Sequence, residues 1–204
     1  TVNYELGFWQ EINKDMGVEV VLFYKDIYNL LSTKTITTYN TVKYGLYSNK
    51  DYGNVRGLEL VYDYNAGPMS IVANYTFQYT RGIADSPTSS FSREGANQDP
   101  ITKLIPLNWD QRHTMNVTAG YNTKKYGATL SVFYNSGSAY TFEPISENPL
   151  ANVNLLPNNS YKPSNYTINL SSYYNLFKTG SRITFEVYNL FDTLFDHSDT
   201  RRLP

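Results

Sequence analysis

Cysteine is absent from the chain, and histidine and methionine are scarce, with 2 His and 3 Met in 204 residues. Without cysteine there is neither a disulfide framework nor a thiolate metal site, and His113 and His197 alone are too few for a His-based metal cage. A net charge of −1 provides no basic field that would attract nucleic acid. The longest unbroken apolar run, residues 20–24, is far shorter than the ~18 residues of a membrane-spanning helix. We therefore expect no metal, no cofactor, no nucleic-acid binding and no transmembrane helix.

Aromatic residues, in contrast, are abundant: 20 Tyr and 10 Phe contribute to an aromatic fraction of 16%, a composition that favours β-strands. Apolar and polar residues alternate with a period of two, which is the spacing of a strand with two different faces. The alternation predicts an all-β fold without a convincing helix. The eight predicted strands are residues 3–8, 18–25, 57–64, 70–79, 114–121, 128–135, 166–174 and 182–187.

The two faces of these predicted strands differ in chemistry. One face is aliphatic and aromatic and carries no charge; Leu60 and Leu130 are typical members. The other face is built from Asn, Thr, Ser, Gln, Gly and charged residues, and it is expected to face water. The charged residues that would point into the lumen of a barrel are Glu19, Lys25, Glu59 and Asp63.

The connections between the predicted strands alternate between two lengths. Short turns rich in Asn, Asp, Lys and Gly lie at residues 13–16, 65–69, 123–126 and 175–180. Long connections lie at residues 27–56, 80–113 and 136–165. This alternation is typical of outer-membrane barrels, whose turns are periplasmic and whose loops are extracellular. Aromatic residues near both ends of the apolar stripes also match the two girdles of such a barrel.

Several segments resemble the C-terminal barrel of TonB-dependent outer-membrane receptors. They are YELGF at residues 4–8, FYKDI at 23–27, NVRGLEL at 54–60, WDQRHT at 109–114 and VYNLFD at 187–192. Together, in this order and spacing, they cover nearly the whole chain. The resemblance implies an antiparallel up-and-down transmembrane β-barrel of about 22 strands with a plugged lumen. Residues 1–204 are then a fragment of one barrel domain, with about eight strands, and the plug domain and the terminal strand are absent.

The resemblance also implies a function. Receptors of this family import a scarce nutrient across the Gram-negative outer membrane, such as an iron chelate, cobalamin, an oligosaccharide or a peptide. The implied partners are outer-membrane lipid, the receptor's own N-terminal plug domain and the inner-membrane energy-coupling complex, and a surface lipoprotein can assist with cargo. Other readings of the pattern are a small closed eight-stranded porin or adhesin, a barrel hydrolase and a soluble β-sandwich.

Aromatic residues in the long connections are the candidate ligand-binding residues, because exposed rings among Asn and Ser suit stacking on sugars, aromatic chelators or peptides. The same rings could instead pack loop against loop. Asp110 and His113 put an acid and a base close together without a nucleophile, so we expect a polar strand entry that bonds neighbouring loops, and no enzyme. The candidate ligand-binding residues are Tyr39, Tyr44, Tyr47, Tyr52, Trp109, Tyr140, Phe142 and Tyr161.

Overall fold

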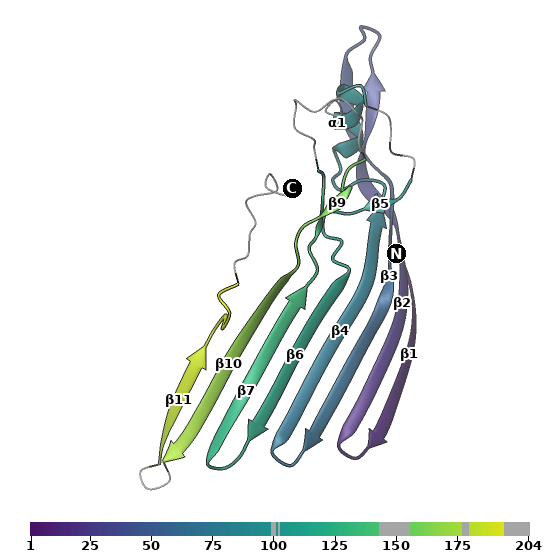
Figure 1. Cartoon of the computed structure of the whole chain (residues 1–204). Coiled ribbons are helices and arrows are strands. Elements are labelled where there is room, and N and C mark those ends of the chain that lie inside the picture. The colour runs from purple at the N-terminus through teal and green to yellow at the C-terminus, as the bar shows by residue number, and fades with distance from the viewer. Residues whose placement is uncertain (99–100, 102, 143–155, 177–179, 194–204) are drawn as a thin grey trace.

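The computed structural model describes residues 1–98, 101, 103–142, 156–176 and 180–193. Its main sheet is antiparallel with the strand order β1-β2-β3-β4-β6-β7-β10-β11, so the chain runs up and down across one curved layer (Figure 1). The strands are β1 (Val2–Asn13), β2 (Met16–Thr37), β3 (Lys43–Ala66), β4 (Met69–Gly82), β6 (His113–Asn122), β7 (Tyr126–Asn135), β10 (Asn165–Leu176) and β11 (Ser181–Val187).

Four small elements lie in the long connections, beyond the ends of the main strands. A two-residue strand β5 (Ile105–Pro106) pairs with the end of β4, and β8 (Ala139–Tyr140) pairs with β9 (Ser160–Tyr161) in a separate two-stranded sheet. One short helix, α1 (Ser89–Gly95), lies beside the far end of β2 and β3 (Figure 1). No helix among the described residues is both long and apolar enough to cross a membrane.

Each of the eight strands predicted from the alternation falls inside one observed strand of the main sheet, which confirms the all-β meander. The prediction of a long loop at residues 27–56 is wrong. There β2 and β3 continue as one extended hairpin, the arm, whose turn lies at residues 38–42. The strands escape a period-two reading because the register shifts twice, between Ile27 and Leu30 and again between Leu30 and Leu31. Helix α1 was also not predicted.

The register confirms that the apolar residues share one face. One row of directly paired residues crosses six strands, and the row beside it, built from the residue next to each of these in its strand, is mostly polar. The apolar row is Val20, Leu60, Tyr75, Met115, Tyr134 and Tyr166. The polar row is Val21, Glu59, Thr76, Thr114, Asn135 and Asn165.

The apolar face is not covered by protein. The buried hydrophobic residues of the described chain are Ile105, Leu107 and Ala139, which all lie in the long connections. In the sheet, Leu6 is 71% and Leu130 is 39% exposed. Because a large exposed apolar surface marks a binding face or a membrane face, and no second layer packs on it within the described residues, the β-sandwich reading fails. Strands β1 and β11 are the two edges and do not pair with each other, so these eight strands form an open wall.

Aromatic rings lie over glycine on the polar face. A Cβ atom at Gly57 would lie 2.7 Å from the Phe23 ring and 2.2 Å from the Phe77 carbonyl oxygen. Similarly, a Cβ atom at Gly127 would lie 2.5 Å from the Tyr173 ring. A side chain at either position would displace the ring or the neighbouring strand, so both positions must be glycine.

Candidate ligand-binding site in the long connections

A hollow lies between the arm and the connection that carries α1. Its volume is about 700 Å³, within the usual range for small-molecule sites. Its lining is rich in hydroxyl groups and contains both positive and negative charges. The polar lining residues are Thr33, Thr35, Thr37, Lys50, Asp51, Ser89, Ser90, Arg93, Glu94 and Gln98. We call this hollow the arm cavity.

Alternation on the arm produces the hydroxyl-lined wall of this cavity. Thr33, Thr35 and Thr37 are separated by one residue each along β2, so their side chains leave the same face of the strand. That face holds hydrogen-bond donors and acceptors in a row, a spacing that suits a ligand with several hydroxyl, carbonyl or carboxylate groups.

Three contacts hold helix α1 against the arm. The Thr33 hydroxyl donates to the Pro87 carbonyl oxygen at 2.7 Å. The Phe91 ring lies against Gly45, where a Cβ atom would come within 3.3 Å of it. Lys43 and Glu94 form an ion pair at 3.3 Å. The Thr33 methyl group would lie even closer to such a Cβ atom, at 2.5 Å, so the missing side chain at Gly45 leaves room for both Thr33 and Phe91.

The charge of Glu94 is favoured by its neighbours. A hydrogen bond from Thr35, followed by the hydrogen bond from Lys43, lowers the pKa of Glu94 below its ordinary value despite some desolvation. Glu94 is therefore ionised at neutral pH. Its side chain is exposed, so this ion pair stabilises the docking of α1 only slightly.

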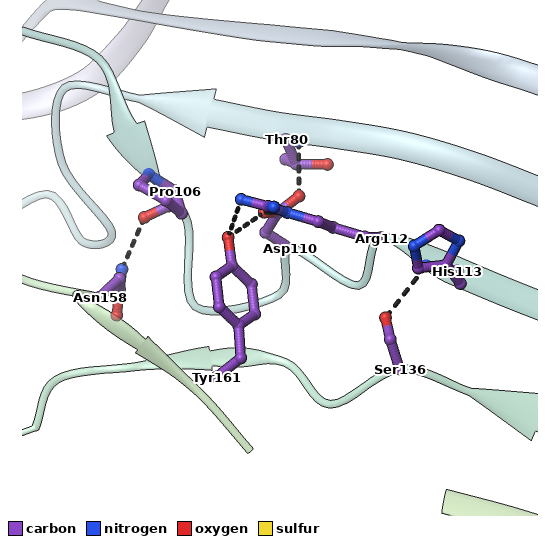
Figure 2. A network of polar contacts seen from close by, with 8 residues as sticks. All are labelled: Thr80, Pro106, Asp110, Arg112, His113, Ser136, Asn158 and Tyr161. Atoms are coloured by element: carbon purple, nitrogen blue, oxygen red, sulfur yellow. Dashed lines mark hydrogen bonds and ion pairs between the residues drawn. The ribbon is translucent and has the colours of Figure 1, made fainter. Parts of the chain in front are cut away.

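A second polar cluster, the Asp110 network, joins two long connections (Figure 2). The Asp110 carboxylate is 1% exposed and accepts hydrogen bonds from the Thr80 backbone N–H at 2.7 Å and from the Tyr161 hydroxyl at 2.8 Å. Arg112 donates to the Tyr161 hydroxyl oxygen at 2.8 Å, and its Nε lies 3.8 Å from the Asp110 carboxylate. Burial, followed by the hydrogen bond to Asp110, raises the pKa of Tyr161. The expected polar strand entry that bonds neighbouring loops is present here.

Asn158 makes a further link between the same connections. Its side-chain amide donates to the Asp85 carboxylate at 2.5 Å and to the Pro106 carbonyl oxygen at 2.8 Å. Both connections are thus fixed to each other and to the end of β4. A smaller cavity of about 260 Å³ lies beside this frame, with Trp109, Leu107 and Leu30 in its lining.

Comparison with known proteins shows which family has this architecture. The sequence model for the TonB dependent receptor-like β-barrel matches residues 1–190. The chain belongs to this family. No curated protein matches it at a significant level. Among solved structures it is similar to the outer membrane transporter YddB from Escherichia coli, with a TM-score of 0.59 and 12% identity. The match covers 94% of this chain and 28% of YddB, so the likeness shows the fold, and the chain spans little more than a quarter of that transporter.

The candidate ligand-binding aromatics of this TonB-dependent receptor barrel fall into different environments. Tyr39, Tyr44 and Tyr47 are exposed on the arm, with Tyr39 at its turn. Trp109, 54% exposed, borders the smaller cavity, and Phe142 is also exposed. The other three are half-buried: Tyr52 donates a hydrogen bond to Asp26, Tyr140 lies in β8, and Tyr161 belongs to the Asp110 network.

No candidate aromatic lines the arm cavity, and the hydroxyl and charged residues that do line it were missed from the sequence. The alternation of Thr33, Thr35 and Thr37 was a signal for a polar strand face. The carboxylates and the lysine predicted to face the lumen do share the polar face of the sheet. In the register, Val21 pairs with Glu59, Gly17 with Asp63, Glu19 with Val61 and Lys25 with Val55.

Metal ligands do not converge in the described part of the receptor barrel. No group of three or more His, Asp or Glu side chains there is arranged to hold a metal ion. His197 lies outside the described residues. His113 is engaged within the sheet, where its ring nitrogen and the Tyr75 hydroxyl are 2.7 Å apart.

Proposed function

We propose that this chain is part of the wall and outer loops of a receptor that actively imports a polar nutrient across the outer membrane. The observation that carries the proposal is an open antiparallel wall, apolar and uncovered on one face, in a chain whose family is TonB-dependent. Such a wall needs further strands to close, because an open sheet edge is not tolerated in lipid. We place the apolar face against lipid and the arm outside the cell.

A closed eight-stranded porin fits the structure less well, because β1 and β11 do not pair. The energy for import would come from the inner-membrane complex through the plug domain, as the family membership suggests. No catalytic role is proposed, because the acid and base of the Asp110 segment are engaged in joining connections.

For the cargo, we propose a small molecule with several hydrogen-bonding groups, such as an oligosaccharide, a peptide or an iron chelate. The arm cavity presents the hydroxyl-bearing side chains of Thr37 and Ser90 beside a positive group, Lys50, and a negative group, Asp51. A site of this kind binds acceptor-rich and hydroxyl-rich ligands through directional contacts. The exposed rings of Tyr44 and Tyr47 on the arm could add stacking at the entrance.

Two measurements on the full-length receptor test the proposal. Whole cells are offered labelled ferric chelates, cobalamin, oligosaccharides and peptides, with and without a functional TonB system. Uptake of one class should require the receptor and the TonB system. Uptake that persists without energy coupling would favour the passive porin.

The site is tested with Lys50→Gln against Lys34→Gln, a matched exposed lysine on the same arm that does not line the cavity. Loss of a charge-assisted hydrogen bond should weaken cargo binding to whole cells by about tenfold or more. Lys34→Gln should change binding less than about twofold. If both variants bind cargo as the unmodified receptor does, the cargo is held elsewhere, and the arm-cavity assignment is wrong.

A further inference from the structure

Three guanidinium groups gather around one tyrosine ring at the end of the sheet that leads into the long connections. The Cζ atoms of Arg56 and Arg81 each lie 5.8 Å from the centre of the Tyr79 ring, and that of Arg112 lies 4.9 Å away. Arg112 also lies 4.6 Å from the centre of the Tyr161 ring, so two rings fix its plane. We call these three residues the arginine cluster.

The register places this cluster on the apolar face. Tyr24 pairs with Arg56, and Arg56 pairs with Tyr79, so all three side chains leave the same face of the sheet. Arg81 follows Tyr79 by two residues within β4 and therefore shares this face, and Arg112 reaches the same ring. This is the face assigned above to lipid. The cluster lies at its long-connection end, where aromatic residues mark the outer membrane interface.

The charge of the cluster is only partly neutralised by the protein. Among the described residues, Arg112 has one carboxylate partner, Asp110 at 3.8 Å, whereas neither Arg56 nor Arg81 has an ion pair. The Nε atoms of Arg81 and Arg112 are buried and have no hydrogen-bond acceptor. These two Nε atoms are covered by protein, but the Arg56 side chain is exposed and Arg81 and Arg112 are half-buried, so the cluster remains accessible to an anion from outside the sheet.

We propose that Arg56, Arg81 and Arg112 bind the phosphate group of an anionic glycolipid in the outer leaflet. Guanidinium groups bind phosphate through paired, charge-assisted hydrogen bonds, and stacking on a ring holds them in position for this contact. The neighbouring apolar residues of β4, Phe77 and Tyr75, continue the same face toward the membrane centre and offer a surface for acyl chains. A phosphate-bearing lipid would contact both the arginine cluster and this apolar surface, whereas free phosphate would contact only the arginine cluster.

The test uses the full-length receptor in detergent micelles. Binding is measured for a fluorescent outer-leaflet glycolipid that carries phosphate and for the same glycolipid after enzymatic dephosphorylation. The unmodified receptor should bind the phosphorylated form about tenfold more tightly or better. The double variant Arg56→Gln/Arg81→Gln should lose this preference, and Arg56→Lys/Arg81→Lys should keep part of it because the charge remains. Arg112 is left intact because it supports the Asp110 network.

Three controls separate the outcomes. Lys34→Gln, an exposed lysine of the arm, should bind like the unmodified receptor. Inorganic phosphate should not displace the glycolipid at comparable concentration; displacement would mean a free-phosphate site and would overturn the lipid assignment. Cargo uptake should survive in the double variant, so a failure of the glycolipid site is distinguishable from a failure of the proposed transport.

Correct insertion is checked by the shift in gel mobility between heated and unheated samples. If the double variant does not insert, the single variants Arg56→Gln and Arg81→Gln are measured, and each should reduce the preference by about threefold. The proposal is wrong if inserted variants retain the full preference for phosphate. In that case the arginines serve only to stack on Tyr79.

Discussion

An arginine placed at mid-strand on the apolar face should destabilise the barrel far more than the same arginine one residue further along. Leu130 pairs with Ala119 and Leu170 on the apolar face and is 39% exposed. Ser131 pairs with Thr118 and Asn169 on the polar face. Both lie near the middle of β7, so their depth in the membrane is the same.

A charge on the lipid face costs about 2–4 kcal/mol at the bilayer midplane and about 0–1 kcal/mol near its interfaces. Leu130→Arg should therefore lower the unfolding free energy by about 2–4 kcal/mol, and Ser131→Arg by about 1 kcal/mol or less. The assay is reversible denaturant unfolding of the full-length barrel in lipid vesicles. Equal losses for the two variants would refute the assignment of faces, and so would a larger loss for Ser131→Arg.

Three further predictions concern packing, loop attachment and pH. Gly57→Val should lower the free energy of unfolding by about 3 kcal/mol or more, because the new side chain meets the Phe77 carbonyl oxygen, and it should impair insertion as seen by gel mobility. The control is Gly7→Val, whose Cβ atom would meet nothing nearer than 3.7 Å and which should insert normally. Asp110→Ala should cost on the order of 3 kcal/mol of local stability, measured as faster hydrogen exchange in residues 103–113. The lowered pKa of Glu94 stabilises α1 docking at neutral pH, and this contribution is lost as pH falls below 4.5 through the lowered pKa; exchange in α1 should rise over that range, but not in Glu94→Gln.

The sheet was predictable from the sequence because lipid on one side and water on the other force a period of two. Every strand segment between the two aromatic girdles obeys this constraint, and one slip would carry a whole apolar set to the wrong face. The row that contains Leu60 and Tyr75 was therefore assigned correctly without knowledge of the pairing. The expectation that the chain is a fragment of a larger barrel also implies that its first and last strands do not pair, which the open edges of β1 and β11 confirm.

The arm was not predictable by the same reasoning. On the proposed placement of the arm outside the membrane, the strand beyond Ile27 has no lipid on either face, so no apolar alternation is required. Two register shifts then break the remaining pattern, and Asn29 takes a left-handed backbone conformation with φ 60°. Helix α1 has only seven residues, SSFSREG, three of which are serine. It depends on the contact of Phe91 with the arm rather than on local helix propensity.

The candidate site was only partly accessible from the sequence, for a related reason. Exposed tyrosines can be recognised by residue type, but the arm cavity arises where residues 33–37 meet residues 83–98. That meeting depends on the fit of Phe91 at Gly45 and on the contact of Thr33 with Pro87. No local pattern reports such a contact.

The central claim, a wall with lipid on one face and an aqueous lumen on the other, is tested most directly by spin labels on adjacent residues. The chain contains no cysteine, so a single introduced cysteine carries the only label in this part of the full-length receptor. Four variants are labelled and measured in lipid vesicles: Glu59→Cys, Leu60→Cys, Leu130→Cys and Ser131→Cys. Labels at 60 and 130 should relax faster with oxygen, which concentrates in lipid, and labels at 59 and 131 with a water-soluble nickel chelate. The same response at all four positions, or the reverse pattern, would contradict the account.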